Sequence, residues 1–322
     1  GIVFAETGAD VDTLLRNADV AMYEAKEAGK ARHAVFEPAM HTAIVQRLQL
    51  ETDLLAATAS PEAAGLSLVY QPIVDLRTGE MRGVEALVRW QHATRGPISP
   101  TVFIPVAERT GAILPLGDWV LETACRQLVA WRTLWLTEHW DPANMPLVSV
   151  NISSKQLEEK HFIATVADIL ARTNAPADCI TLEITESVIM RDTHASLQSL
   201  RALKALGVRL AIDDFGTGYS SLSYLQRFPV DVLKIDRAFV EGVSRGGSDA
   251  ALARTILTLG QSLGLQTVAE GVETESERVQ LAQMGCVLAQ GYLFARPKPA
   301  DEVTAWIRRR ALAAPYATQT AT

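Results

Sequence analysis

The sequence lacks the features that mark secreted, zinc-binding and membrane-spanning proteins. Its three cysteines, Cys125, Cys179 and Cys286, are widely separated, and none belongs to a Cys-x-x-Cys pair. Such a set favours reduced thiols in a cytoplasmic protein over disulfides or a zinc site. The chain has no run of about 18 apolar residues and no signal-peptide pattern. We therefore expect a cytoplasmic protein with no membrane segment in this stretch.

Positive charge is also in short supply. The chain carries 30 Lys and Arg residues against 37 Asp and Glu residues, for a formal net charge of −7. A surface of this sign does not attract a nucleic acid polymer, so we expect no such partner. An anionic small substrate would need local cations to reverse the potential at its site.

The pattern along the chain predicts one large domain with short segments on either side. With 322 residues and 48% hydrophobic content, the chain can bury a sizeable core. Residues 1–38 contain one strand-like and one helical stretch, too little for a core of their own. We interpret them as the tail end of a neighbouring domain in a longer chain. The main domain is expected at 39–312, and residues 313–322 are expected to be a disordered tail.

The main domain alternates between strand-like and helical patterns. This alternation favours an α/β fold with a parallel sheet, and eight strands are the number that closes a (β/α)₈ TIM-type barrel. About four residues around Gly79 separate the first two strands, too few for a crossover helix, so we expect the first strand to run antiparallel to the others. The predicted strands are 67–76, 81–90, 146–153, 179–187, 208–215, 230–239, 265–272 and 287–294.

Polar side chains stand at the ends of these strands. In a barrel of this type, the strand ends and the loops after them build the active site at the C-terminal mouth. So many carboxylates around one mouth would repel one another severely unless cations hold them. The residues that we expect to meet there are Glu85, Arg89, Asn151, Glu183, Glu186, Asp213, Asp214, Lys234, Asp236, Glu270, Glu273 and Gln290.

The types of side chain indicate which cation would bind. An asparagine with carboxylates is a set of hard oxygen ligands, which suits Mg²⁺ or Mn²⁺ and not zinc. Neighbouring carboxylates can hold two ions ~4 Å apart, the arrangement that clamps the oxygens of a phosphoryl-transfer reaction. We expect all six histidines to lie outside the strand ends: His33, His41, His92, His139, His161 and His194.

Two details of the acidic set remain open at this stage. Lys234 is either a structural counter-ion for Asp236 or Asp231, or a donor that orients an attacking water. Asp213 and Asp214 are adjacent in LAIDDFGTGYSSL (210–222), and successive strand side chains point to opposite faces. Both acids can reach the same ions only if the strand breaks there, and we expect the glycines at 216 and 218 to give that freedom.

The motifs of the main domain, taken together, resemble a known enzyme family. EALVR (85–89) is followed in order by VNIS, LEITES, DDFGTGYSSL, LKIDRAFV, AEGVE and QGYLF, which resembles the EAL-domain cyclic-di-GMP phosphodiesterases over roughly 44–310. Residues 1–38, with ADVAMYEAKEAGK, resemble the C-terminal end of a GGDEF (diguanylate cyclase) domain. The GGDEF signature itself is absent from the chain, so that activity cannot reside here.

The resemblance implies a function and assigns roles to the residues. It implies hydrolysis of cyclic di-GMP to linear pGpG with two Mg²⁺ or Mn²⁺ ions, and Lys234 as the residue that positions the water. Glu186 resembles the glutamate that anchors the loop after the fifth strand, and Glu273 matches a further catalytic position. Gln71, Arg89 and Gln290 are the implied substrate contacts. The implied metal ligands are Glu85, Asn151, Glu183, Asp213, Asp214, Asp236 and Glu270.

Two other interpretations compete with the enzyme. The first is a catalytically silent EAL domain that acts as a cyclic-di-GMP receptor; such members usually lose a metal ligand or the loop after the fifth strand, and this sequence retains both. The second is a scaffold or dimerisation domain. The segment after the fifth strand could form a homodimer interface, an expectation based on analogy with the family.

Overall fold

A computed structural model describes residues 1–5, 10–27, 29, 31–138, 145–186, 193–216 and 225–313. The chain divides into two compact units, residues 1–59 and residues 60–322. No helix in the described part of the chain is long and apolar enough to cross a membrane. The predicted tail (313–322) and much of the proposed dimer segment (217–224) lie outside the described residues, apart from Ala313 at the end of the last helix.

The first unit consists of two helices and one short bridge. Its helices are α1 (Val11–Glu27) and α2 (Pro38–Ala59). The face of α1 that carries Ala21 and Ala25 is buried, as its apolar spacing predicts. The strand predicted at the start of the chain is reduced to an isolated parallel bridge between Ile2 and Val35.

The second unit is a closed barrel of eight strands with a ninth strand added beside β2. Because β1 pairs with both β2 and β9, the sheet closes on itself. β1 runs antiparallel to both of these neighbours, whereas the other barrel pairs are parallel. The predicted barrel with a reversed first strand is therefore confirmed. The strands are β1 (Leu66–Asp75), β2 (Met81–His92), β3 (Gly96–Ile98), β4 (Leu147–Asn151), β5 (Ile180–Thr185), β6 (Arg209–Phe215), β7 (Val232–Ile235), β8 (Gln266–Ala269) and β9 (Leu288–Gln290).

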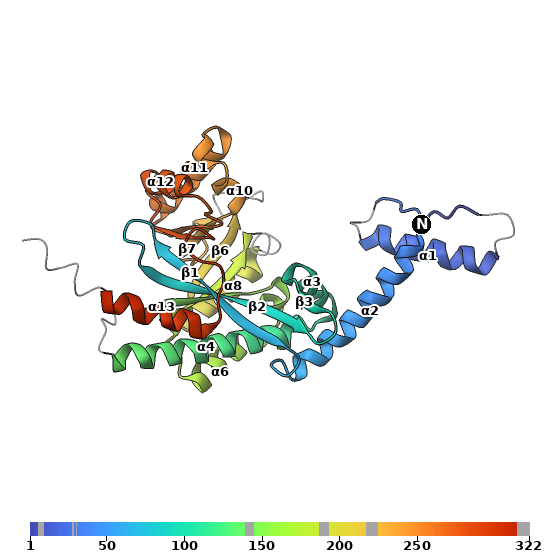
Figure 1. Ribbon diagram of the computed structural model, residues 1–322, viewed down its shortest axis with the longest axis horizontal. Helices are drawn as coiled ribbons and strands as arrows, with labels where there is room; N and C mark the ends of the chain where they lie inside the picture. Colours follow the sequence, from blue (N-terminus) through green and yellow to red (C-terminus); the bar gives the residue numbers. More distant parts are fainter. Residues whose placement is uncertain are drawn as a thin grey trace, which may run out of the picture. The chain divides into compact units, whose positions relative to one another are not determined.

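Helices cover the outside of the barrel. In Figure 1, α4 and α13 lie side by side, and the Trp131 Nε1–H donates to Thr304 Oγ1 at 2.8 Å between them. The covering elements are α3 (Pro100–Thr110), α4 (Ile113–Thr137), α5 (Ser154–Glu158), α6 (Phe162–Thr173), α8 (Thr193–Ala205), α10 (Arg237–Val240), α11 (Ser248–Leu263), α12 (Glu275–Gln283), α13 (Ala300–Ala313) and the short 3₁₀ turns Ala177–Cys179 and Val243–Arg245.

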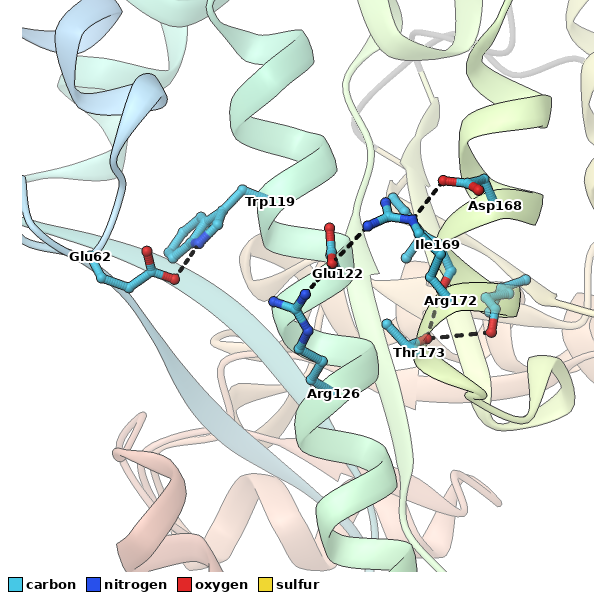
Figure 2. A network of polar contacts seen from close by, with 9 residues as sticks. Glu62, Trp119, Glu122, Arg126, Asp168, Ile169, Arg172 and Thr173 are labelled. Carbon is cyan, nitrogen blue, oxygen red and sulfur yellow. Dashed lines mark hydrogen bonds and ion pairs between the residues drawn. The ribbon is translucent and has the colours of Figure 1, made fainter.

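Polar contacts tie the outer helices together at the surface (Figure 2). Glu122 on α4 accepts hydrogen bonds from Arg126 on the same helix and from Arg172 on α6, the latter at 3.0 Å. The Trp119 Nε1–H donates to Glu62 Oε1 at 2.8 Å, which holds the segment before β1 against α4. Both arginines are at least half exposed, so solvent screens these ion pairs and they add little to stability. The buried apolar faces of the helices hold this layer in place.

The interior of the barrel is built in two layers that follow the two-residue period of its strands. An apolar layer fills the lower part: Ile73, Ala211, Val232, Val268 and Leu288. Two positions further along each strand toward the mouth comes a polar or charged residue, and in the reversed strand β1 the order along the chain is inverted. This second layer contains Gln71, Asp213, Lys234, Glu270 and Gln290. The apolar layer thus lies directly beneath the charged layer.

Leu288→Ala tests this apolar layer. The change removes a buried side chain, 6% exposed, from the apolar layer, so we expect the free energy of unfolding to fall by about 2–5 kcal/mol. Urea denaturation measures the change. Val287→Ala, at the adjacent and 54% exposed position, is the control and should cost no more than about 0.5 kcal/mol. Equal losses in the two variants would contradict the layered interior.

Candidate active site

The site is centred on a buried lysine. Lys234, on β7, is 1% exposed. Its Nζ lies 2.6 Å from Glu183 Oε2, 2.7 Å from Glu270 Oε1, 3.1 Å from Asp213 Oδ1 and 3.7 Å from Glu85 Oε2. These carboxylates come from β2, β5, β6 and the end of β8, so the barrel closure assembles them around one ammonium group.

These partners of Lys234 differ from the ones suggested by the sequence. Among the described residues, the ion pairs of Lys234 include neither Asp231 nor Asp236. Asp231 is instead held by Lys204, whose Nζ lies 2.8 Å from Asp231 Oδ2. Lys234 is therefore a counter-ion, but for Glu85, Glu183, Asp213 and Glu270 and not for the suggested Asp231 or Asp236.

Burial and crowded charges shift the pKa values of the cluster. Burial by itself lowers the pKa of Lys234, but the carboxylates around it, Asp213 and Glu183 foremost, raise it well above its usual value. Burial raises the pKa of Glu183 to about 8, although Lys234 acts in the opposite direction. Burial also raises the pKa of Glu270 well above that of an ordinary glutamate. One ammonium group does not balance these acids, so the cluster favours further cations.

Strand β6 loses its regular geometry at the two adjacent aspartates. Its register with β7 shifts between Ile212 and Phe215. Asp214 has a φ of 52°, in the left-handed region that aspartate tolerates better than most residues. The predicted strand break is therefore present, and it occurs at Asp214 itself. Gly216 also has a positive φ of 102°, whereas position 218 lies outside the described residues.

The break brings three carboxylates close enough to share a cation. One oxygen each from Asp213, Asp214 and Glu270 lies within 4.8 Å of the others. Burial raises the pKa of Asp214 to about 6, and the charge of Asp213 and a hydrogen bond with Asp236 add to the rise. A group of carboxylate oxygens at this separation fits a hard divalent cation such as Mg²⁺ or Mn²⁺. The donor set thus fits the predicted type of metal.

Glu85 is held between two amide side chains. The Asn151 Nδ2–H donates to Glu85 Oε1 at 2.7 Å, and the Gln290 Nε2–H donates to Glu85 Oε2 at 2.6 Å. Gln290 also donates to Gln71 Oε1 at 3.0 Å. The structure therefore brings these four predicted residues into one chain of hydrogen bonds beside Lys234.

Glu186 lies at the base of the loop after β6. Its Oε2 accepts a hydrogen bond from the backbone N–H of Gly216 at 2.8 Å, and the residue is only 4% exposed. This bond fixes the point at which the chain leaves the strand, immediately after Asp213 and Asp214. The rest of the loop lies outside the described residues.

The mouth contains a pocket of about 260 Å³ lined by predicted and unpredicted residues. Gln71, Glu85, Asp213, Glu270, Glu273 and Gln290 line it, together with Arg237 and Tyr292. The sequence reasoning missed these last two, although Arg237 directly follows Asp236 and Tyr292 lies in QGYLF. Arg237 Nη2 lies 3.1 Å from Glu273 Oε1, and the Arg296 guanidinium lies 4.3 Å from the centre of the Tyr292 ring.

Two predicted site residues, Arg89 and Asp236, make contacts outside the lysine cluster. Arg89 is partly buried, donates to the Val88 carbonyl at 2.8 Å and is not among the residues that line the pocket. Asp236 caps α10 by accepting from the Ala238 N–H at 2.7 Å. The expectation that every histidine lies outside the strand ends is wrong for His92, because β2 continues to that residue.

Comparisons with known proteins agree with this architecture. The sequence profile of the EAL domain matches residues 53–297. The chain is 44% identical to the bifunctional diguanylate cyclase/cyclic di-GMP phosphodiesterase MucR of Pseudomonas aeruginosa over 91% of its own length and 41% of that protein. It is 39% identical to the cyclic di-GMP phosphodiesterase PdeR of Escherichia coli over 94% of its length and 44% of that protein. It therefore spans less than half the length of either relative.

A solved structure of the MucR phosphodiesterase in complex with c-di-GMP superimposes with a TM-score of 0.72 at 45% identity. The superposition covers 79% of this chain and 99% of the other. The profile match alone spans more than half of the chain. The chain therefore belongs to the EAL domain family.

Proposed function

We propose that this chain hydrolyses one phosphodiester bond of cyclic di-GMP to linear pGpG, in a reaction that requires Mg²⁺ or Mn²⁺. The observation that carries the proposal is the acidic mouth, where Glu85, Asp213 and Glu270 line the pocket and pair with the buried ammonium group of Lys234 beneath it. The names of MucR and PdeR support the choice of substrate. An acidic mouth binds an anionic dinucleotide only when cations are present, which makes the reaction metal-dependent.

Two ions are proposed for the pocket. When bound, they neutralise charge on the phosphate oxygens and activate the attacking water. Asp214 belongs to the second ion because the bulge in β6 aims it beside Asp213. The proposed ligands are Glu85, Asn151, Glu183, Asp213, Asp214, Asp236 and Glu270.

The chain's own residues position the reacting groups. Lys234 keeps its proton and orients the attacking water through its ammonium donors. Arg89 is proposed to grip a phosphate bidentately once substrate draws it from the Val88 carbonyl. Glu186 holds the start of the loop after β6, and Glu273 pairs with Arg237 and so fixes the position of this arginine at the pocket. Most of the acceleration then comes from positioning and charge stabilisation.

Three further parts of the proposal concern the longer protein. Residues 1–38 are proposed to be the C-terminal part of a GGDEF domain, since similarity to the bifunctional relative MucR covers 91% of the chain and so extends upstream of residue 53. A homodimer through the segment after β6 is proposed by analogy, and residues 217–224 of that segment lie outside the described residues. A cytoplasmic location is proposed because all three cysteines are free.

The rival function is a cyclic-di-GMP receptor without turnover. It would use the same pocket, so fold and affinity for the nucleotide do not separate the two. The retained acids and Lys234 favour the enzyme, because a receptor does not need a buried cluster whose excess negative charge favours the binding of cations. Tight binding of cyclic di-GMP without formation of pGpG, in the presence of Mg²⁺ or Mn²⁺, would establish the receptor.

Glu85→Ala tests the catalytic role of the cluster. We expect the rate of pGpG formation to fall by on the order of 10²–10³-fold or more, because charge stabilisation in a preorganised site is worth at least this much. Chromatographic detection of pGpG with Mn²⁺ measures it, and circular dichroism checks the fold. Asp168→Ala, which removes a carboxylate on the outer helix α6 (Figure 2), is the control and should keep wild-type rates. Full activity in Glu85→Ala would refute the assignment.

Asp214→Asn tests the electrostatic cost of the second-ion position. In the metal-free protein, the pKa of Asp214 is about 6, above its ordinary value near 4. The folded state therefore binds the proton more tightly than the unfolded state does. The contribution of this proton to the free energy of unfolding is lost as the pH rises from about 4 through 6. We expect the stability advantage of Asp214→Asn over wild type to grow across that range and then to level off.

Urea midpoints in EDTA between pH 4.5 and 8 measure this difference. Saturating Mg²⁺ supplies the control, because binding to the folded state stabilises wild type and should do so less in the variant. A stability difference that is independent of pH would show that Asp214 carries no raised pKa.

A further inference from the structure

Both oxygens of the Glu85 carboxylate are held by separate amide groups. Asn151 donates to Oε1 at 2.7 Å and Gln290 donates to Oε2 at 2.6 Å. Each carboxylate oxygen has two lone-pair positions, so each keeps one free for a cation. Two bonds from opposite sides fix both the direction and the rotation of the carboxylate. The aim of Glu85 therefore depends on where these two amides are held.

Gln290 is in turn held by a second glutamine. Its Nε2 donates both to Glu85 Oε2 and, at 3.0 Å, to Gln71 Oε1. The Gln71 Nε2–H donates to the carbonyl of Ala295 at 3.2 Å, which fixes the orientation of the Gln71 amide. A flipped Gln290 would turn its carbonyl toward the Glu85 carboxylate and the Gln71 carbonyl, which both accept. Donation therefore runs outward from the Gln290 amide, to Glu85 on one side and through Gln71 to the Ala295 carbonyl on the other.

The orientation of Gln290 is retained although it leaves a polar atom unsatisfied. Gln290 is 5% exposed, and its Oε1 has no hydrogen-bond partner in the described part of the structure. A buried carbonyl without a donor costs free energy. The side chain nevertheless adopts the rotamer in which its Nε2 serves Glu85 and Gln71 together. The two acceptors thus decide the position of this amide.

The reversed strand places Gln71 where it can act. In the β1–β2 ladder, Gln71 lies directly opposite Glu85. On its other side β1 pairs with β9, where Gln290 lies opposite Ile73, two residues from Gln71 and on the same face. A slip of one residue in β1 would turn Gln71 to the outside of the barrel. The register of β1 therefore places Gln71 within reach of Gln290 on β9, which in turn contacts Glu85 on β2.

We propose that Gln71 is a positioning residue, which acts through Gln290 to aim Glu85 at a divalent cation. This inference rests on the proposed function in its requirement for a metal. It differs from the direct substrate contact that the family resemblance implies for Gln71. The Gln71 Oε1 is engaged by Gln290, its Nε2 is engaged by Ala295, and only 8% of the residue is exposed.

Gln71→Met tests the inference without any turnover. Methionine keeps the unbranched length of glutamine and removes the amide. Loss of a hydrogen-bond partner behind a metal ligand typically weakens metal affinity by about 10–100-fold. We expect the dissociation constant for Mn²⁺, measured by calorimetry on the full chain without nucleotide, to rise by about tenfold. Gln71→Leu is the second variant if the methionine protein does not fold.

Ser149→Ala is the matched control for the loss of a buried polar group. Ser149 lies opposite Glu85 in the β2–β4 ladder and is 5% exposed. It supplies neither of the two amide bonds to the Glu85 carboxylate. Its Mn²⁺ dissociation constant should stay within about twofold of wild type. A loss as large as that of Gln71→Met would mean that any polar deletion in the barrel interior near Glu85 weakens the site.

A double variant separates action through Gln290 from an independent effect. If Gln71 acts only through Gln290, the pair Gln71→Met and Gln290→Met should bind Mn²⁺ no more weakly than Gln290→Met alone. Additive losses of Mn²⁺ affinity would overturn the proposal that Gln71 acts through Gln290. Kinetics give the second test: at saturating Mn²⁺, Gln71→Met should recover most of kcat with an unchanged KM for cyclic di-GMP.

The outcomes distinguish this inference from the proposed function. Unchanged Mn²⁺ affinity in Gln71→Met, with a raised KM at saturating Mn²⁺, would make Gln71 a substrate contact and overturn the inference alone. A wild-type chain that binds Mn²⁺ but forms no pGpG would refute the proposed function and leave the affinity comparison valid. A wild-type chain that binds no Mn²⁺ would overturn both.

Discussion

An ammonium group at 1% exposure survives inside this barrel because four carboxylates surround it. Neither charge is stable alone in such a place, since an unpaired buried ion costs several kcal/mol. The acids and Lys234 therefore constrain each other's positions, and with them the strands that carry them. The apolar side chains below lower the local dielectric constant, which strengthens the charge interactions in the layer above. This single charge cluster connects the core of the barrel with its chemistry.

The cluster contains more negative than positive charge, and this surplus is what makes the mouth a cation site. Burial, with the neighbouring carboxylates adding to it, raises the pKa values of Glu183, Glu270 and Asp214 in the metal-free molecule. The bulge in β6 increases the surplus of negative charge by turning Asp214 toward Asp213, which a regular strand would not allow. A divalent ion relieves this repulsion, so metal binding and the stability of the mouth are coupled.

The reversed strand β1 supplies residues to both interior layers of the barrel. Because β1 lies between β2 and β9 in antiparallel register, it presents Gln71 to side chains on both neighbours. The same strand contributes Ile73 to the apolar layer. One strand thus supports the apolar layer beneath the site and orients the amide that contacts Glu85. The register of β1 therefore bears on the proposed metal site as well as on the barrel core.

Much of this molecule follows from its sequence through local rules. The two-residue period places apolar and polar residues in successive layers, so each acid could be assigned to the mouth from its place at a strand end. The short turn at Gly79 fixed the reversal of β1, because four residues cannot form a crossover helix. The motif EALVR and those after it identified the family, and its profile match confirms this.

The tertiary structure alone decided which of these residues touch. Lys234 could have paired with Asp231, three residues away, but closure of the barrel gives it Glu183 and Glu270, and Lys204 takes Asp231. The strand break was expected from the glycines, yet it occurs in the backbone of Asp214. Arg237 and Tyr292 line the pocket, although no sequence pattern predicted them there. Hydrogen-bond partners depend on register and closure between distant strands, and no local pattern in the sequence records these.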